Sequence, residues 1–356
     1  MRADNHILHG DALTLLPDLP PVDMVFADPP YNLQLKNELW RPNLTRVDAV
    51  DDDWDQFNGF ADYDHFTREW LAAVRAIMAD SATIWVSGTY HNIFRIGRIM
   101  QDMGFWLLNT ITWYKPNAMP NFRGTRLKND VEFVIWAKRS EDSTYTFNYH
   151  KMKRYNSGKQ LGSVWAIAVC GGPERLRDAE GDKLHPTQKP EALLERIIVA
   201  STHPGDRVLD PFSGTGTTAA VAKRLRRRWI GIEQDADYVA ASRERIAAGT
   251  PLPAADPLVK GRQTPRRVPF RSLIAHGYLQ PGQILTLDRP TVEAVVQADG
   301  TLRANGFTGS IHQTGAHLKG TPSCNGWRHW RFVDADGTSR LLDVLRDRYR
   351  RDIPAD

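Results

Sequence analysis

Short apolar stretches, each followed by a turn signal, recur through the first 250 residues of the chain. They are rich in β-branched and aromatic residues, and short apolar runs of this kind are typical of buried strands. The predicted strands are Ile7–His9, Val22–Ala27, Thr83–Val86, Arg207–Leu209 and Trp229–Ile232. Helix-like segments lie between some of them: Phe66–Met78, Glu191–Ala200, Thr217–Leu225 and Ala236–Ala247. Strands that alternate with helices predict an α/β fold, with a mostly parallel sheet covered by helices on both faces.

The pattern changes near residue 250. Residues 251–267 are rich in proline and polar residues, which predicts a linker after a first domain at residues 1–250. Residues 268–356 carry short strand-like pieces and glycines, so a small α+β or mostly-β domain is expected there. Within the first domain, residues 33–63 and 117–159 are predicted to be excursions from the sheet. Loops of that length in a compact domain are usually functional or disordered.

The composition is that of a globular protein, with 41% hydrophobic and 25% charged residues. No apolar run approaches the roughly 20 residues that span a bilayer, and the first residues lack the apolar stretch of a signal peptide. Cys170 and Cys324 form no disulfide framework, and the 11 histidines include no His-x-x-x-His spacing, so no metal site is expected. A reducing cytoplasm fits best.

The charge is unevenly distributed along the chain. Residues 257–356 hold 15 Lys/Arg against 9 Asp/Glu, whereas residues 1–256 hold 31 against 33. A basic C-terminal region beside a near-neutral body hints at a polyanionic partner such as nucleic acid. Many globular domains carry a similar charge, so this feature alone does not decide the partner.

The motif Asp28-Pro29-Pro30-Tyr31 follows directly on a hydrophobic strand. The exocyclic amine of adenine is a poor nucleophile because its lone pair is delocalised into the ring, so its methylation needs hydrogen-bond acceptors on both N–H groups. Asp28 can supply a carboxylate oxygen and Pro29 a main-chain carbonyl, while the two prolines stiffen the turn. Tyr31 offers a face on which an extruded base can stack. The alternative is a simple strand-ending turn, in which Asp-Pro is common.

A second motif, residues 209–218, has two glycines two positions apart between a predicted strand and a predicted helix. Glycines allow close approach of the backbone to a ligand. Glu233 ends the next strand roughly 20 residues later, where an acidic side chain can bind ribose hydroxyls. The loop lacks both the Gly-Lys-Ser/Thr of a phosphate-binding loop and the third glycine of the dinucleotide motif. These features together favour a cofactor with ribose but no phosphate, such as S-adenosylmethionine.

Two further motifs have both a structural and a functional interpretation. Asp11, in His9-Gly10-Asp11-Ala12, can accept a hydrogen bond from the adenine amine of a cofactor, or it can cap the following helix. Thr187 and Lys189 precede another predicted helix and can hold a carboxylate at its start, although a proline-flanked helix start explains the same residues.

The positions of the acidic residues connect these motifs. Asp11, Asp28, Asp210 and Glu233 all follow or end predicted parallel strands. The carboxyl ends of such strands share one edge of the sheet, where open α/β sheets bind ligands. The sequence therefore predicts one site at this edge.

The chain resembles the amino-methyltransferases of DNA called the β class, in which Asp-Pro-Pro-Tyr precedes the glycine loop. The resemblance covers residues 5–247 and rests on the four motifs in the expected order. It implies a catalytic set of Asp28, Pro29 and Tyr31, with Pro30 completing the turn. It also implies that S-adenosylmethionine is bound by Asp11, Ala12, Thr187, Lys189, Asp210, Phe212, Ser213, Gly214, Gly216, Thr217 and Glu233.

Residues 32–35, 47–52, 54–57, 87–94 and 119–125 are similar to a narrower group, the GANTC-specific, cell-cycle-regulated adenine methyltransferases of alphaproteobacteria. Residues 269–285 and 309–330 resemble the C-terminal domain of that group, which is of the restriction-enzyme and adenine-methylase-associated type. The resemblance implies a solitary methyltransferase, associated with the nucleoid, that acts on double-stranded DNA. A symmetric target suits a homodimer.

A base inside a duplex must leave the stack before its amine can react. Arginine is the commonest partner of guanine and asparagine of adenine, so polar residues on the two excursions and in the C-terminal domain are candidates for reading DNA. The alternative for each is a solvated surface side chain. The candidates are Arg41, Arg46, Asn121, Arg123, Arg126, Arg267, Ser310, His312, Asn325 and Trp327.

Two other functions remain open at this stage. The first is methylation of cytosine N4 or of RNA adenine, although an aspartate at position 28 favours DNA adenine. The second is a non-catalytic DNA-binding regulator that keeps the fold, which predicts decayed motifs, whereas all of them are intact here. Methylation of cytosine C5 needs a Pro-Cys pair, and neither Cys170 nor Cys324 follows a proline.

Overall fold

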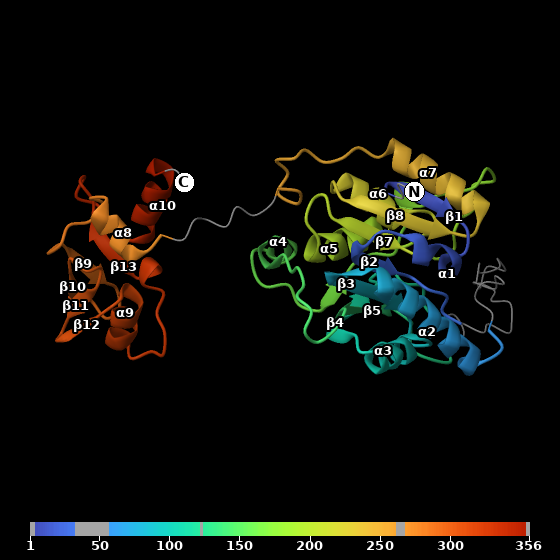
Figure 1. The fold of residues 1–356 in the computed structure, drawn as a ribbon, viewed down its shortest axis with the longest axis horizontal. Helices are drawn as coiled ribbons and strands as arrows, with labels where there is room; N and C mark the ends of the chain where they lie inside the picture. Colours follow the sequence, from blue (N-terminus) through green and yellow to red (C-terminus); the bar gives the residue numbers. More distant parts are fainter. Residues whose placement is uncertain (1–3, 33–56, 122–123, 261–267, 354–356) are drawn as a thin grey trace. The chain divides into compact units, whose positions relative to one another are not determined.

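The computed structural model describes residues 4–32, 57–121, 124–260 and 268–353. The chain forms two compact units, Met1–Gly261 and Arg262–Asp356, each with its own sheet (Figure 1). The strands of the first unit are β1 (His6–His9), β2 (Val22–Ala27), β3 (Met78–Gly88), β4 (Trp106–Tyr114), β5 (Val131–Lys138), β6 (Val164–Ala166), β7 (Arg207–Asp210) and β8 (Arg228–Glu233). Its helices are α1 (Ala12–Leu15), α2 (Phe60–Ile77), α3 (Ile93–Asp102), α4 (Tyr149–Met152), α5 (Glu191–Ser201), α6 (Thr217–Arg224) and α7 (Ala236–Ala248).

The first sheet has the order β1-β8-β7-β2-β3-β5-β4-β6. All neighbouring strands in it are parallel except the two pairs that involve β5. The predicted α/β fold with a mostly parallel sheet is confirmed. Each of the five predicted strands corresponds to an observed one, because short β-branched runs between turns are a strong signal for buried strands.

Side chains of the central strands alternate between two hydrophobic layers, as the period of two in a strand requires. Val25 and Ala27 of β2 belong to the layer that α1, α2 and α3 cover. Met24 and Phe26 belong to the opposite layer, under α5 and α6. Figure 1 shows these two sets of helices on opposite faces of the sheet. Both faces of β2 are therefore buried, which explains its continuous apolar sequence.

The connections that follow the neighbouring strands β2 and β7 leave in opposite directions across the sheet. From β2 the chain passes through α2 to β3 on one side, and from β7 through α6 to β8 on the other. Met24 pairs with Val208 and Val25 with Leu209. Crossovers that leave in opposite directions create a crevice beyond the carboxyl ends of such strands. Asp28 follows β2 and Asp210 ends β7, so both lie at this crevice.

Three predictions about irregular segments need correction. Residues 117–159 are not an excursion as a whole, because β5 pairs with β3 and β4 inside the sheet. The excursion at 33–63 ends earlier than predicted, since α2 begins at Phe60. The first part of the predicted linker packs on the first unit, where Leu252 and Leu258 contact its core and the Lys151 ammonium donates to the Leu258 carbonyl at 2.9 Å. The mixed apolar and polar composition of these segments gives no periodic pattern from which such contacts could be predicted.

The second unit contains a six-stranded antiparallel sheet with the order β12-β11-β10-β9-β13-β14. Its elements are α8 (Phe270–Ala275), β9 (Ile284–Leu287), β10 (Val292–Val296), β11 (Leu302–Ala304), β12 (Phe307–Gly309), α9 (Ile311–Lys319), β13 (Trp330–Val333), β14 (Ser339–Leu341) and α10 (Asp343–Asp352). Its core is built on the fully buried Trp330, whose indole N–H donates to the Ile311 carbonyl at 2.8 Å. A small α+β or mostly-β domain was predicted here, and the observed unit, with helices beside its sheet, is of the α+β kind.

Candidate active site

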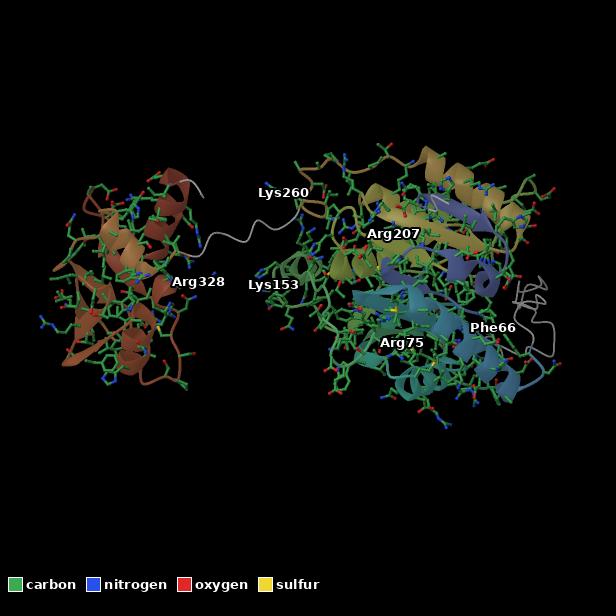
Figure 2. The ribbon with its side chains drawn as sticks, viewed as in Figure 1. Phe66, Arg75, Lys153, Arg207, Lys260 and Arg328 are labelled. Atoms are coloured by element: carbon green, nitrogen blue, oxygen red, sulfur yellow. The ribbon has the colours of Figure 1, made fainter. Side chains whose placement is uncertain are left out.

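A cavity of about 810 Å³ lies at the carboxyl ends of the parallel strands. It is lined from α2 as well, by Phe66, whose ring packs 6.2 Å from that of Phe212; Figure 2 labels Phe66 on α2. Of the predicted site residues, those that line the cavity are Ala12, Asp28, Pro29, Pro30, Tyr31, Thr187, Lys189, Asp210, Phe212, Ser213, Gly214, Thr217 and Glu233. The sheet thus gathers segments that are far apart in the sequence into one site.

The Asp28 carboxylate is held on both oxygens. The Tyr31 hydroxyl donates to Oδ1 at 2.7 Å, and the Lys189 ammonium donates to Oδ2 at 2.5 Å. Lys189 is separated from Asp28 by 161 positions and was predicted to face a cofactor carboxylate instead. Its ammonium lies 5.2 Å from the centre of the Tyr31 ring as well. The Asp28 motif and the motif before α5 therefore form one hydrogen-bonded unit.

The turn that carries Asp28 is stabilised by hydrogen bonds from buried polar side chains. The Tyr63 hydroxyl on α2 donates to the Pro30 carbonyl at 2.9 Å, and the Asn92 amide donates to that hydroxyl at 3.0 Å. The Asn92 carbonyl oxygen in turn accepts from the Thr89 N–H at 2.9 Å. Tyr63 and Asn92 are 1% exposed each, so these bonds form away from water and stiffen the turn beyond what the prolines achieve.

The glycine loop has the backbone that its sequence predicts. Gly214 and Gly216 adopt φ of +50° and +73°, values that side chains disfavour. A Cβ on Gly216 would lie 2.8 Å from Cβ of Ser242, whose hydroxyl donates to the Gly214 carbonyl at 2.9 Å. The loop is therefore pressed against α7 and has no room for a side chain at this position. Gly216 itself does not line the cavity, and its role is to shape the turn.

Two acids lie beside this loop, the buried Asp210 and the half-buried Glu233. Glu233 accepts from the N–H groups of Gly214 at 2.7 Å and Asp235 at 2.9 Å. Burial raises the pKa of Glu233, and these N–H groups oppose the rise. Burial also raises the pKa of Asp210 to about 7, although the hydroxyl of Thr218 and the N–H of Phe212 stabilise its charged form.

His185 is a cavity residue that the sequence motif contains but that was not assigned a role. Burial, together with the charges of Lys189 and Arg175, lowers its pKa to about 4, so the imidazole is neutral at neutral pH. It lies against Gly214, where a Cβ would come within 3.2 Å of Nε2, and its ring centre is 4.8 Å from that of Tyr238. A neutral ring here adds an apolar wall to the cavity.

Asp11 has the structural role that was considered as the alternative. Its side chain caps α1 by accepting from the N–H of Thr14 at 3.0 Å, and it does not line the cavity. The Gln234 amide, which does line the cavity, donates to Asp11 at 3.3 Å. Thr217 accepts from Arg245 through its hydroxyl oxygen at 2.8 Å.

The DNA-reading candidates fall into three groups. Arg41, Arg46, Arg123 and Arg267 lie outside the described residues. Asn121 and the exposed Arg126 belong to the connection from β4 to β5, which leaves the sheet at the same edge as Asp28, since β4 runs in the direction of β3. The Arg126 guanidinium donates to the Tyr90 hydroxyl at 3.0 Å.

The remaining candidates belong to the second unit. His312 and Asn325 are exposed there, and Ser310 caps α9. The prediction for Trp327 is wrong, because its side chain is only 6% exposed and packs in the core of this unit under the Arg346 guanidinium. The aromatic ring of Trp327 packs in the core and is not exposed for contact with DNA.

The lining of the cavity fits S-adenosylmethionine in three respects. Among the lining residues that the structure describes, the carboxylates of Asp28, Glu233 and Asp235 outnumber the ammonium of Lys189, which favours a sulfonium cation and disfavours a phosphate. Glu233 adjoins the glycine turn, where ribose hydroxyls can reach it. Within the described part of the chain, the buried hydroxyl of Ser213 has no hydrogen-bond partner and is available to a ligand.

Comparison with known families agrees with this site. Residues 22–244 match a family model for N6/N4 enzymes described as DNA methylase, and residues 253–354 match one described as Restriction Enzyme Adenine Methylase Associated. The chain belongs to the N6/N4 DNA methylase family. Among its relatives, Type II methyltransferase M.HinfI of Haemophilus influenzae is 41% identical over 347 residues, which cover 97% of this chain and 96% of the relative. Type II methyltransferase M2.LlaDCHI of Lactococcus lactis subsp. cremoris is 39% identical over 68% of this chain and 89% of its own length.

Solved structures show the same catalytic fold. The complex of M1.HpyAVI with S-adenosylmethionine has 27% identity and a TM-score of 0.51, over 68% of this chain and 98% of its own. PvuII DNA methyltransferase, named as cytosine-N4-specific, reaches a TM-score of 0.54 at 24% identity, over 68% of this chain and 88% of its own, and shows the fold alone. The family and the cavity together identify the chain as a DNA methyltransferase whose cofactor is S-adenosylmethionine.

The described residues contain neither a cluster of metal ligands nor a membrane-spanning helix. Among residues 4–32, 57–121, 124–260 and 268–353, no group of three or more His, Cys, Asp or Glu side chains is placed to hold a metal ion. In the same residues no helix is long and apolar enough to cross a membrane.

Sequence reasoning missed Tyr63, Asn92, His185 and Tyr238. Tyr238 lies in the first turn of α7, directly after the strand that ends at Glu233, and this position was a usable signal. Nothing in the sequence around Tyr63 or Asn92 indicates that Asn92 donates to Tyr63 and Tyr63 to Pro30, because these contacts join α2, the residue before α3 and the Asp28 turn across the fold.

The replacement Gly216→Ala is expected to raise the dissociation constant of S-adenosylmethionine by at least roughly tenfold, because an alanine at positive φ is strained by about 1–3 kcal/mol and collides with Ser242. Isothermal titration calorimetry measures this effect. Gly181→Ala is the matched control, since Gly181 has φ of +86° but no atom within 4 Å of an added Cβ. Equal binding by the two variants would contradict the proposed role of the Ser242 contact.

The raised pKa of Asp210 predicts a pH-dependent stability of the ligand-free protein. The folded protein holds the Asp210 proton up to about pH 7, whereas the unfolded chain releases it near pH 4. This contribution to the free energy of unfolding is present at low pH and is lost as pH rises towards 7, by up to about 1.4 kcal/mol per unit. Asp210→Asn removes it, so its stability relative to wild type should increase between pH 5 and pH 7.

Chemical denaturation at several pH values measures that difference, provided that the signal reports unfolding of the first unit. Asp80→Asn is the control, because the Asp80 side chain is 98% exposed. A constant difference between Asp210→Asn and wild type across this range would show that the Asp210 proton is not involved.

Proposed function

We propose that this chain transfers the methyl group of S-adenosylmethionine to N6 of adenine in double-stranded DNA, with GANTC as its target. The supporting observation is the Asp28 carboxylate, fixed by Tyr31 and Lys189 in the cavity that also contains the Gly214 loop. Acceptor and methyl donor can therefore meet without a rearrangement of the sheet.

The reaction follows from these positions. The adenine leaves the duplex and enters the cavity, where its amine donates to Asp28 and to the Pro29 carbonyl. These two bonds draw the nitrogen towards tetrahedral geometry and make its lone pair available. A bond forms between N6 and the methyl carbon as the carbon–sulfur bond breaks, and the sulfur keeps the electron pair. The methylated nitrogen is cationic and strongly acidic, so Asp28 accepts one proton and then releases it to water.

Several features favour adenine over the alternatives. Asp28 is an acid, where a serine would favour cytosine N4, and the family model that matches residues 253–354 has adenine methylase in its description. The GANTC target rests on the resemblance of residues 32–35, 47–52, 54–57, 87–94 and 119–125 to that group of enzymes. A palindromic target suits a homodimer. A regulator without activity would not need the buried bonds that hold Asp28.

Reading of the target is assigned to two surfaces. Asn121 and Arg126 lie at the edge of the sheet that carries Asp28, where they can contact bases beside the extruded adenine. His312 and Asn325 are exposed on the second unit, whose basic composition favours contacts with phosphates. Some assignments rest on the sequence alone. They are DNA contacts by Arg41, Arg46, Arg123, Arg267 and Ser310, and cofactor binding by Asp11.

The replacement Asp28→Ala should abolish methylation while DNA affinity changes little, because Asp28 acts on the amine and not on the phosphates. A loss of at least roughly 100-fold in rate is expected for a residue that contacts the reacting group. Methyl transfer from labelled S-adenosylmethionine measures the rate, and a gel-shift assay measures DNA binding. A variant that keeps its methylation rate would refute the assigned role of Asp28.

The same assay identifies the modified base. Nucleoside analysis of plasmid DNA methylated by the wild-type protein should yield N6-methyladenine, and sequencing of modified bases in an unmethylated host should place it in GANTC. N4-methylcytosine without N6-methyladenine would establish the alternative activity, and labelling of RNA alone would establish an RNA substrate.

Deletion of residues 262–356 should weaken DNA binding by at least roughly tenfold, since several phosphate contacts are lost with the basic unit. S-adenosylmethionine binding should persist, because the cofactor cavity belongs entirely to the first unit. Calorimetry with the cofactor tests that the truncated chain is folded. Unchanged DNA affinity in a folded truncated chain would contradict the role given to the second unit.

A further inference from the structure

Lys189 is a buried lysine whose charge is matched by acids of the site. It is 7% exposed, and its ammonium donates to Asp28 Oδ2 at 2.5 Å and to the Thr187 carbonyl at 3.4 Å. Burial alone lowers the pKa of Lys189, but the charges of Asp28 and Glu132 and the hydrogen bond to Asp28 outweigh burial and raise it. Lys189 is therefore charged at neutral pH.

The geometry around Asp28 leaves a defined part of the carboxylate free. Each carboxylate oxygen offers two lone pairs. Tyr31 uses one on Oδ1 and Lys189 uses one on Oδ2, so that one lone pair on each oxygen remains for another donor. Because both donors are buried, the plane of the carboxylate cannot rotate freely, and Asp28 lines the cavity in one orientation.

We propose that Lys189 is a positioning residue for Asp28: it orients the carboxylate and places a positive charge beside it, and it does not serve as the binding site for the cofactor's carboxylate. This inference rests on the proposed function, because it concerns the group that accepts the adenine amine. A lysine that precedes α5 thereby becomes part of the catalytic end of the cavity.

The physical need for such a partner follows from the surroundings of Asp28. The carboxylate of Glu233 lines the same cavity as Asp28. A protonated Asp28 would present a hydroxyl to the amine on one oxygen and so lose an acceptor. The Lys189 ammonium, 2.5 Å from Oδ2, sets the opposite charge beside the carboxylate, whose two oxygens then both act as acceptors. Tyr31 orients the carboxylate but brings no charge, so it cannot replace Lys189.

The first test compares Lys189→Met and Lys189→Gln with wild type in the full-length protein. With S-adenosylmethionine and DNA both saturating, kcat at neutral pH should fall by roughly 100-fold in Lys189→Met. The dissociation constant of S-adenosylmethionine, from calorimetry, should change by less than about threefold. The opposite pattern, a weaker cofactor complex by tenfold or more with kcat retained, would assign Lys189 to the cofactor's carboxylate and overturn the proposal.

The second test separates charge from packing through the pH profile of kcat. Lys189→Gln keeps an N–H donor but has no charge, so the acid limb of its profile should move towards neutral pH by about 1 unit or more. Raising the pH should then recover part of the lost activity. A Lys189→Gln profile that is lowered uniformly, without a shift of the acid limb, would show that charge on Lys189 has no influence on Asp28.

Lys151→Met is the matched control for loss of a buried lysine. Lys151 is 8% exposed, and its ammonium contacts the backbone carbonyl oxygens of Leu258 and Val259. It should leave the pH profile and cofactor binding as in wild type. Should Lys151→Met move the acid limb as far as Lys189→Gln does, the shift would be a general effect of removing buried charge.

A double-mutant cycle distinguishes failure of this inference from failure of the proposed function. If Lys189 acts through Asp28, Lys189→Met should have almost no further effect on kcat in an Asp28→Asn background. Full additivity of the two effects would overturn the inference while Asp28 stays catalytic. An Asp28→Ala variant that retains methylation would instead remove the proposed function itself.

Discussion

The site depends on the parallel pairing of β2 with β7. Met24 opposite Val208 and Val25 opposite Leu209 fix the two strands in one register. Their carboxyl ends therefore meet, and the turn that begins at Asp28 lies beside the loop that begins at Asp210. A shift of one residue would exchange the two hydrophobic layers of β2, because its side chains alternate between faces. Burial of both faces thus holds the Asp28 turn and the glycine loop in their relative positions.

Electrostatics at this edge follow from the same geometry. Asp28, Asp210 and Glu233 line one cavity, where their charges would repel one another, and the structure limits that repulsion in different ways. Asp28 is paired with Lys189, and Glu233 accepts from backbone N–H groups. Asp210 holds its proton up to about pH 7. The resulting cavity suits a cationic sulfonium. The three acids differ in their partners and in protonation, which allows each a separate role.

The second unit has a different construction and carries its own core. An antiparallel sheet around Trp330 needs no contact with the first unit for its burial. Trp327 belongs to the same core and is 6% exposed, so both tryptophans stabilise this unit by burial.

The sequence by itself determined the α/β class, the five strands with strong apolar patterns, and the motifs at their carboxyl ends. These features are local, because strand period, turn residues and glycine conformation depend on neighbours in the chain. It could not reveal β5 inside residues 117–159, the packing of residues 251–260, or the buried bond from Tyr63 to Pro30. Above all, only the tertiary structure decided that Lys189 contacts Asp28 across 161 positions. Such a contact depends on where two loops meet after the sheet has formed, and no periodicity or motif spacing encodes that distance.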